Sequence, residues 1–485
     1  MRRVLGSTLS VLVLGALLGG CAVDIDNAPI NVPLSATTPP LPPVPSQKAD
    51  ETTAVGVAFS GGGTRAAAFS FGVLKQFAQT PVPPQAGGPT LLDHVEFISG
   101  VSGGSITAAY FGYRGQPALD DFRDKFLIQN LEGSLLTKVT PDNFMRALAG
   151  GVNDRRGVQT WLDAHLFHGA TFASLGGGDK PSVWVNASDI YNGTPFVFDQ
   201  QTFDALCSDL SKLPISEAVA ASAAVPIAFA PIVIQSFPDS CHYTLPPWAA
   251  SALTGPSAPA NLQAFAKALQ NYHDPAVMKY VKLLDGGLID NYGLSGLVLR
   301  REQASTPYGP FSPGQAVKLR RLLFVVVDAG QSIDAHWVDT VKGPSGVALI
   351  MAATDTALDA GKRASFDLFS ATMEEWHQSL VNYRCGLPRS EVQRLRGTLD
   401  GWDCKDMQFY IARLTFGMLP PQEAATLSQL PTTLALPANQ IDALIAGGGE
   451  ALTRSAEFQQ FLRSVGEPVP QVESVKTVGV EAPLR

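Results

Sequence analysis

Residues 53–74 of the chain read TAVGVAFSGGGTRAAAFSFGVL, and this stretch decides the fold class. Residues 53–59 form a short apolar run, which predicts a buried strand. The turn SGGGTR follows at 60–65, and the segment AAAFSFGVLKQF after it has the composition of a helix. A strand, a glycine turn and a helix in this order predict an α/β protein. The turn would place backbone N–H groups beside a helix N-terminus, where negative charge is stabilised.

A second strand, turn and helix begin at residue 95. Residues 95–99 (VEFIS) predict a short strand, and GVSGG at 100–104 precedes the helix-like SITAAYFGY. In this GxSxG pattern, small residues such as Gly100 and Gly103 on both sides of Ser102 allow a sharp strand-to-helix turn, which exposes the serine hydroxyl. Ser102 is therefore the predicted nucleophile.

The best candidate for the base is Asp285, in YVKLLDGG at 280–287. A predicted strand ends in this carboxylate, and Gly286 and Gly287 let the chain turn without a Cβ atom crowding the site. Carboxylates at the carboxyl ends of sheet strands point into the crevice where α/β proteins bind ligands. An ordinary triad would instead use a histidine downstream of the acid. His336 and His377 have that order, but neither lies in a convincing strand-end loop.

The glycine turn also matches a dinucleotide fingerprint, since Gly61, Gly63 and Ala66 satisfy GxGxxA. A dinucleotide-binding domain would carry an acidic residue about 20 positions further on. Residues 80–90 (TPVPPQAGGPT) contain no Asp or Glu, which argues against a nicotinamide cofactor.

Together these motifs resemble those of the patatin-like phospholipase family. GGGTR resembles its glycine-rich loop, GVSGG its nucleophile turn and DGG its aspartate motif, and ASAAVP at 221–226 resembles a fourth block that lies between them. The resemblance covers residues 53–330 and is looser beyond. It implies a three-layer α/β hydrolase with a mainly parallel central sheet, followed by a mostly helical C-terminal region.

The same resemblance implies the chemistry. Ser102 would attack the ester carbonyl of a lipid, and Asp285, without a histidine, would take its proton and later activate water. Gly61, Gly62 and Gly63 would donate N–H groups to the oxyanion, and Arg65 would steady that loop or attract an anionic head group. The mechanism implies no metal and no cofactor. Head group, ester position and transfer to acceptors other than water stay open.

The first residues predict export. Arg2 and Arg3 precede an apolar run at 4–18, and LGGC follows at 18–21, which predicts a signal peptide at residues 1–20. LGGC resembles the lipobox of bacterial lipoproteins, which implies acylation of Cys21 and, with alanine at position 22, an outer membrane location facing the periplasm. Seven prolines between 22 and 50 predict a spacer, so residues 21–50 are expected to be a lipid-anchored linker.

Four cysteines remain after Cys21. Their separations suggest the pairs Cys207–Cys241 and Cys385–Cys404, although three connectivities are possible. A periplasmic location would permit disulfide bonds.

The rest of the chain divides into a catalytic domain at 51–330 and a helical region at 331–485 that packs on it. A net charge of -8 without a basic, aromatic cluster argues against a nucleic-acid partner. The apolar segment 218–234 is expected to be core, with Pro226 ending a helix. Segments 111–165 and 236–275 are candidate lids, and the C-terminal region is a candidate cap over the acyl pocket. The oligomeric state stays open.

Two other functions fit the same residues. One is an esterase of the α/β-hydrolase fold that uses Ser102, an acid and His336 or His377. The other is a lipid-binding lipoprotein that does not catalyse any reaction.

Overall fold

The computed structural model of the chain describes residues 27–35, 52–86, 88–136, 138, 140–175, 180–331 and 336–466. The predicted signal peptide, Cys21 and most of the predicted linker lie outside these residues, as does the side chain of His336.

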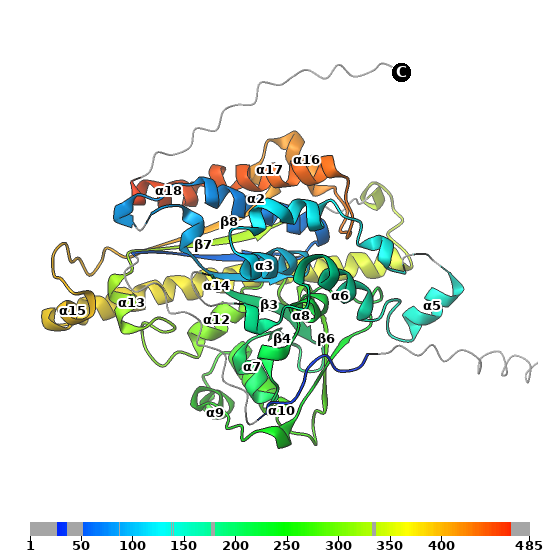
Figure 1. Ribbon diagram of the computed structural model, residues 1–485, viewed down its shortest axis with the longest axis horizontal. Coiled ribbons are helices and arrows are strands. Elements are labelled where there is room, and N and C mark those ends of the chain that lie inside the picture. Colours follow the sequence, from blue (N-terminus) through cyan, green and yellow to red (C-terminus); the bar gives the residue numbers. More distant parts are fainter. Residues whose placement is uncertain are drawn as a thin grey trace, which may run out of the picture.

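A mixed sheet of mostly parallel strands forms the centre of the fold (Figure 1). Its strand order in the described residues is β5-β6-β3-β2-β1-β7-β8, and β4 pairs with β3. Strands β1, β2, β3, β7 and β8 run parallel to their neighbours in this group, whereas β6 is antiparallel to both β3 and β5. The strands are β1 (Thr53–Phe59), β2 (Val95–Val101), β3 (Ser182–Asp189), β4 (Thr194–Val197), β5 (Ile232–Gln235), β6 (Tyr280–Asp285), β7 (Arg321–Asp328) and β8 (Gln408–Thr415).

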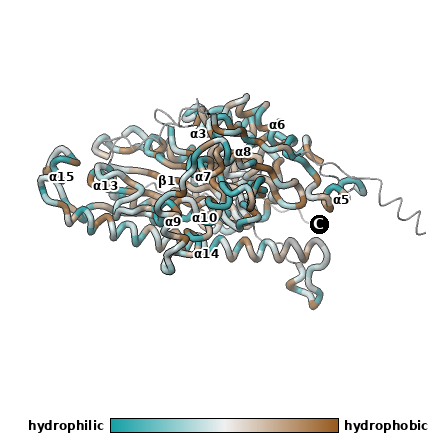
Figure 2. The backbone as a smooth tube through the Cα atoms, turned by 90° about the horizontal axis from the view of Figure 1, so that it is seen from below, coloured by the Kyte–Doolittle hydropathy of each residue, from teal (hydrophilic) through white to brown (hydrophobic). Residues whose placement is uncertain are grey.

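Helices cover both faces of the sheet, and Figure 2 shows the long helix α14 along the side opposite α3. The helices before β5 are α2 (Gly63–Gln79), α3 (Gly103–Arg114), α4 (Ala118–Phe122), α5 (Pro141–Leu148), α6 (Arg156–Leu162), α7 (Gln200–Ala205) and α8 (Ile215–Ser222). Those after it are α9 (Pro247–Thr254), α10 (Ala260–Tyr272), α11 (Gly287–Asp290), α12 (Ser295–Glu302), α13 (Pro313–Lys318), α14 (Val347–Gly386), α15 (Arg389–Arg396), α16 (Pro421–Ser428), α17 (Ala438–Arg454) and α18 (Ala456–Val465).

The sheet is buried on both faces because successive strand residues point to opposite sides. Val55 and Val57 of β1 join the larger core with α2, α3 and α17, whereas Ala54 and Ala58 join a second core with α14. This two-sided burial explains why β1 reads as a continuous apolar run rather than as an alternation. The predicted three-layer α/β architecture with a mainly parallel sheet is confirmed.

The C-terminal region is part of this architecture. Strand β8, which the sequence analysis did not predict, pairs in parallel with β7 over its whole length. Helix α17 crosses α2 at close range, since a Cβ atom added to Gly72 would lie 2.0 Å from the carbonyl oxygen of Ile445. The sheet therefore extends beyond the boundary expected at residue 330.

Residues 27–35 belong to the predicted linker, yet the structure places them on the sheet. The N–H of Ile30 donates to the carbonyl oxygen of Val233 at 3.0 Å. The side-chain amide nitrogen of Asn31 donates to the carbonyl of Gln235, and its amide oxygen accepts the backbone N–H of Gln235, both at 2.8 Å. The segment thus covers the outer edge of β5, which would otherwise expose unpaired backbone groups. This part of the expected linker is therefore hydrogen-bonded to the sheet and does not act as a free spacer.

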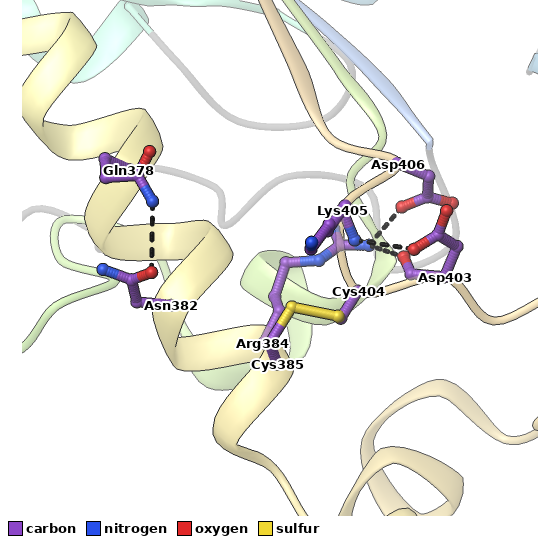
Figure 3. The surroundings of a disulfide bond; sticks show 8 residues. All are labelled: Gln378, Asn382, Arg384, Cys385, Asp403, Cys404, Lys405 and Asp406. Carbon is purple, nitrogen blue, oxygen red and sulfur yellow. Dashed lines mark hydrogen bonds and ion pairs between the residues drawn. A yellow bond between two sulfur atoms is a disulfide. The ribbon is translucent and has the colours of Figure 1, made fainter.

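Two disulfide bonds form, and both join the cysteines that are neighbours in sequence. Cys207 pairs with Cys241, and Cys385 pairs with Cys404. Figure 3 shows the second bond at the end of α14, beside Arg384. The guanidinium of Arg384 is buried, and it donates to the carbonyl of Leu319 at 2.6 Å and to Asp406. The end of α14 is therefore held to the loop that leads into β8.

The apolar segment 218–234 is only partly core. Residues 218–222 end α8 and residues 232–234 lie in β5, and both stretches are buried. Val225 and Ile227, in the loop between them, are exposed, so the prediction of core is wrong at these two residues. Among the described residues, no helix combines the length and the apolar character that a bilayer crossing requires.

Candidate active site

Ser102 stands at the turn between β2 and α3, as the GxSxG pattern predicts. Its backbone has φ 50° and ψ -122°, a conformation that is strained for a residue with a side chain. Such strain is typical of a turn that holds a serine hydroxyl at the top of a sheet. A Cβ atom on Gly103 would lie 1.9 Å from the carbonyl oxygen of Gly63, so the serine turn and the glycine-rich loop are in direct contact.

Asp285 reaches the same place by a strand that runs in the opposite direction. Val101, just before the serine, pairs with Asn186 of β3, and Asp285 pairs with the next residue, Ala187. Asp285 is the last residue of β6, as the sequence predicts. Strand β6 is antiparallel to β3, and its carboxyl end lies level with Ser102. Gly286 packs against the carbonyl of Asn186, where a Cβ atom would lie 2.4 Å away.

The two side chains interact in a buried setting. Ser102 and Asp285 are each 8% exposed. Burial raises the pKa of Asp285 to about 6, although hydrogen bonds from the Gly287 N–H and the Ser102 hydroxyl partly oppose the shift. The Gly287 N–H lies 2.8 Å from Oδ1 of Asp285. A carboxylate with a pKa near 6 can accept a proton near neutral pH, which is what a general base requires.

Ser222 connects the serine to the neighbouring strand. Its hydroxyl accepts the backbone N–H of Ser102 at 2.9 Å and donates to the carbonyl oxygen of Asn186 at 2.6 Å. The side-chain amide of Asn186 in turn donates to the carbonyl of Gly100 at 2.9 Å. The pattern ASAAVP did not indicate a role for Ser222, because a hydroxyl in a helix carries no signal of a partner 120 residues away.

The same segment also supports Asp285. The backbone N–H of Asp285 donates to the carbonyl of Ala224 at 2.9 Å. The backbone N–H of Gly286 donates to the carbonyl of Ser222 at 3.2 Å. Residues 222–224 therefore hold the backbone of both Ser102 and Asp285.

The glycine-rich loop offers two of its three expected donors. The N–H of Gly61 donates to the carbonyl of Asn291 at 3.1 Å, so it is not available to a substrate oxygen. Within the described residues, the N–H groups of Gly62 and Gly63 have no acceptor. Both residues have positive φ, 138° and 60°, which favours glycine at these positions. The expected set of oxyanion donors is thus reduced to Gly62 and Gly63, beside the start of α2.

Arg65 steadies the glycine-rich loop. Its side chain is buried and donates to the carbonyl of Ala329 at 3.0 Å, to the carbonyl of Leu430 and to the hydroxyl of Thr432 at 3.0 Å. Burial lowers the pKa of Arg65 to about 10, against the opposing charge of Asp328. Of the two roles expected for Arg65, the contacts support steadying the loop and leave no exposed guanidinium for a head group.

The C-terminal region also reaches the loop. The N–H of Thr64 donates to the carbonyl of Thr433 at 2.9 Å, and a Cβ atom on Gly63 would lie 2.4 Å from that same oxygen. The segment 430–433 therefore forms one wall of the glycine-rich loop. No motif in this segment indicated that position.

Histidine takes no part in the described site. His377 faces β8, where its ring contacts Phe409 and Nε2 lies 2.9 Å from the carbonyl of Met407. Among the side chains that the structure describes, no histidine hydrogen-bonds to Ser102 or Asp285. The described residues also contain no group of three or more His, Cys, Asp or Glu side chains that could bind a metal ion.

The fold and the site together define a class of α/β protein with a serine after β2 and an aspartate at the end of β6, on the two sides of β3. Residues 57–298 match the family model described as patatin-like phospholipase. The chain belongs to this family, whose members are lipid acyl hydrolases. No curated protein matches the chain in sequence.

Two solved structures are similar to the chain. Human GIVD cytosolic phospholipase A2 has 13% sequence identity and a TM-score of 0.39, and the match covers 86% of this chain and 60% of that one. The ExoU–SpcU complex of the Pseudomonas aeruginosa type III secretion system has 12% identity and a TM-score of 0.21, covering 78% and 66%. The chain thus spans less than two thirds of the length of the human protein.

Proposed function

We propose that the protein is a lipid acyl hydrolase of the phospholipase A or lysophospholipase type that works through an acyl-enzyme. The observation that carries the proposal is the contact between the Ser102 hydroxyl and the buried carboxyl of Asp285, beside the N–H groups of Gly62 and Gly63. These are the three parts that acyl transfer needs: a nucleophile, a base and donors for the oxyanion.

In the first step, Oγ of Ser102 attacks the ester carbonyl carbon while Asp285 accepts the hydroxyl proton. The carbonyl oxygen gains negative charge, which the N–H groups of Gly62 and Gly63 stabilise. The ester C–O bond then breaks, and the leaving alcohol takes the proton from Asp285. The acyl group stays on Ser102.

In the second step, water attacks the acyl-enzyme and gives a proton to Asp285. The bond between Oγ and the acyl carbon breaks, the fatty acid leaves, and Asp285 returns its proton to Ser102. Both steps need Asp285 ionised at the start, which the pKa of about 6 permits at neutral pH.

We further propose that the protein is an exported lipoprotein, held by an acylated Cys21 on the outer membrane facing the periplasm. The sequence pattern at residues 1–21 supports this location. The two disulfide bonds support it as well, because disulfides persist in oxidising compartments such as the periplasm. The anchor would keep the enzyme at a surface of phospholipid, its proposed substrate.

The test is fatty-acid release from mixed phospholipid vesicles by the purified protein. Ser102→Ala and Asp285→Asn are expected to reduce release at least 10³-fold while circular dichroism and thermal unfolding show intact folds. Ser240→Ala and Asp239→Asn change the same residue types at exposed positions and are expected to keep full activity.

Three other results would contradict the proposal. Release that survives Asp285→Asn but disappears in His377→Gln or His336→Gln would favour a triad with histidine. Vesicle binding without hydrolysis of phospholipid or short acyl esters would indicate a lipid-binding protein. Release that survives Ser102→Ala would exclude Ser102 as the nucleophile.

A further inference from the structure

Helix α5 turns its apolar side towards solvent. Phe144 and Leu148 are four residues apart and share one face, which Met145 flanks. Phe144 is 61% exposed and Leu148 is 68% exposed. The polar Asn143 is buried instead, and its amide donates to the carbonyl of Lys138 at 2.7 Å. A helix that packs on a core buries its apolar side, so the orientation of α5 is the reverse of the usual one.

The loop between α8 and β5 exposes apolar side chains beside α5. Ile227 is 59% exposed and has a φ of 73°, which is unusual for a β-branched residue. Its carbonyl accepts the N–H of Val152 at 3.0 Å, and the carbonyl of Ala228 accepts the N–H of Asn153 at 2.9 Å. The chain that follows α5 is therefore paired with this loop.

Asn153 joins a third segment to the same surface. Its amide oxygen accepts the N–H of Leu136 at 2.8 Å, and its amide nitrogen donates to the carbonyl of Ala228 at 3.0 Å. Leu136 is also exposed. We call the resulting surface the apolar patch; it consists of Leu136, Phe144, Met145, Leu148, Val225 and Ile227.

One member of the apolar patch, Val225, directly follows the segment that supports the candidate active site. Val225 directly follows Ala224, whose carbonyl accepts the backbone N–H of Asp285. Ser222, three residues before Val225, holds the backbone of Ser102 through its hydroxyl. A molecule that covers Val225 therefore touches the chain next to the residues that hold the serine and the aspartate.

The first described residue, Asn27, lies close to the chain that follows α5. The side chain of Asn27 donates to the carbonyl of Pro231 at 2.7 Å. Ala230, the residue before Pro231, donates its N–H to the carbonyl of Asn153 at 2.9 Å. Figure 1 shows the dark blue start of the described segment and α5 at the same end of the molecule. Cys21 precedes Asn27 by six residues, which can span at most about 20 Å.

We propose that the apolar patch is a membrane-docking surface that inserts into the leaflet of the phospholipid bilayer that holds the lipid anchor, and that it brings the active site to its substrate. The inference rests on the proposed lipid hydrolase function and on acylation of Cys21. A lipid attached within about 20 Å of Asn27 keeps this end of the protein at the bilayer. Phe144, Leu148 and Ile227 then exchange water for lipid, and Val225 brings the docked loop next to Asp285.

The first experiment places an environment-sensitive dye on single cysteines in the full-length protein. Leu148→Cys carries it on the patch, and Leu368→Cys carries it on an exposed position of α14. In vesicles of phosphatidylethanolamine and phosphatidylglycerol, the dye at 148 is expected to shift to shorter emission wavelength and to be quenched by brominated lipid, whereas the dye at 368 stays in water. Equal behaviour at both positions would overturn the proposal. A shift at 148 without lipid that depends on protein concentration would overturn it too, since a second copy of the chain would then cover the patch.

The second experiment separates docking from chemistry. Phe144→Glu with Leu148→Glu is expected to lower hydrolysis of vesicle phospholipid at least tenfold and to leave hydrolysis of a soluble short acyl ester unchanged. The matched control, Leu349→Glu with Leu368→Glu on α14, is expected to change neither rate. Equal loss on both substrates, or no loss on vesicles, contradicts the docking surface. Absence of all hydrolysis in the parent protein contradicts the proposed function instead, and the dye experiment still tests the surface.

Discussion

The backbone N–H of Ser102 donates to the hydroxyl of Ser222 at 2.9 Å, and this contact joins the serine turn to the segment that supports Asp285. The hydroxyl of Ser222 also donates to the carbonyl of Asn186 at 2.6 Å. Ser222, which is completely buried, is thus a positioning residue for a strained turn.

Ser222→Ala is expected to lower kcat about 10-fold or more with little change in KM. The substitution leaves the Ser102 N–H and the Asn186 carbonyl without their partner, which costs about 1–3 kcal/mol of folding free energy for a buried group. Ester hydrolysis and urea unfolding measure the two effects, with Ser240→Ala as the exposed control. An unchanged kcat with an unchanged free energy of unfolding would show that the contact positions nothing.

The pH dependence of kcat/KM reports the state of Asp285. Because the base must be ionised and burial raises its pKa to about 6, kcat/KM is expected to rise tenfold per pH unit below pH 6 and to level off above it. A soluble ester measured between pH 4.5 and 8 gives the profile. A midpoint near 4, or one that disappears in His377→Gln, would be inconsistent with a buried Asp285 base.

Asp285→Asn is expected to make the protein more stable while it removes activity. The pKa of Asp285 rises from 3.8 in the unfolded chain to about 6, so folding disfavours its charged form. The contribution of Asp285 to the free energy of unfolding is fully present below pH 4, falls as the pH rises through 6, and is lowest above that. The substitution should therefore raise the free energy of unfolding at pH 7.5 by up to ~3 kcal/mol, with a smaller gain at pH 4.5. Urea unfolding at the two pH values measures this effect. A gain in the free energy of unfolding that is larger at pH 4.5 than at pH 7.5 would contradict the prediction.

Gly63→Ala is expected to lower kcat about 10²–10³-fold, comparable to the loss of one oxyanion donor. The added methyl group would lie 2.4 Å from the carbonyl oxygen of Thr433, so the loop must shift. Gly115→Ala is the matched control, because Gly115 also has a positive φ of 67° but has no neighbour within 4 Å of an added Cβ atom. Stability should fall in both variants and activity only in the first. Equal activities would show that the position of the loop at Gly63 is unimportant.

Local patterns in the sequence predicted the elements that bear the site. The strands at 53–59 and 280–285, and the turns that follow them, are present as expected. Apolar runs of strand length and glycines at turns act over a few residues, so the sequence alone carries this information. The alternation that divides β1 between two cores follows from the same local geometry.

The tertiary structure decided which of these elements meet. It reversed β6 relative to β3, added β8 to the sheet, and placed the carbonyl of Asn291 on the Gly61 N–H. It also bound residues 27–35 to the edge of β5 and left Ile227 exposed beside α5. Each outcome depends on backbone groups that every residue shares and on partners far away in the chain. The sequence by itself therefore determined the strands that bear the site, the glycine turns and the candidate nucleophile and base, whereas long-range hydrogen bonding and packing determined how they are held.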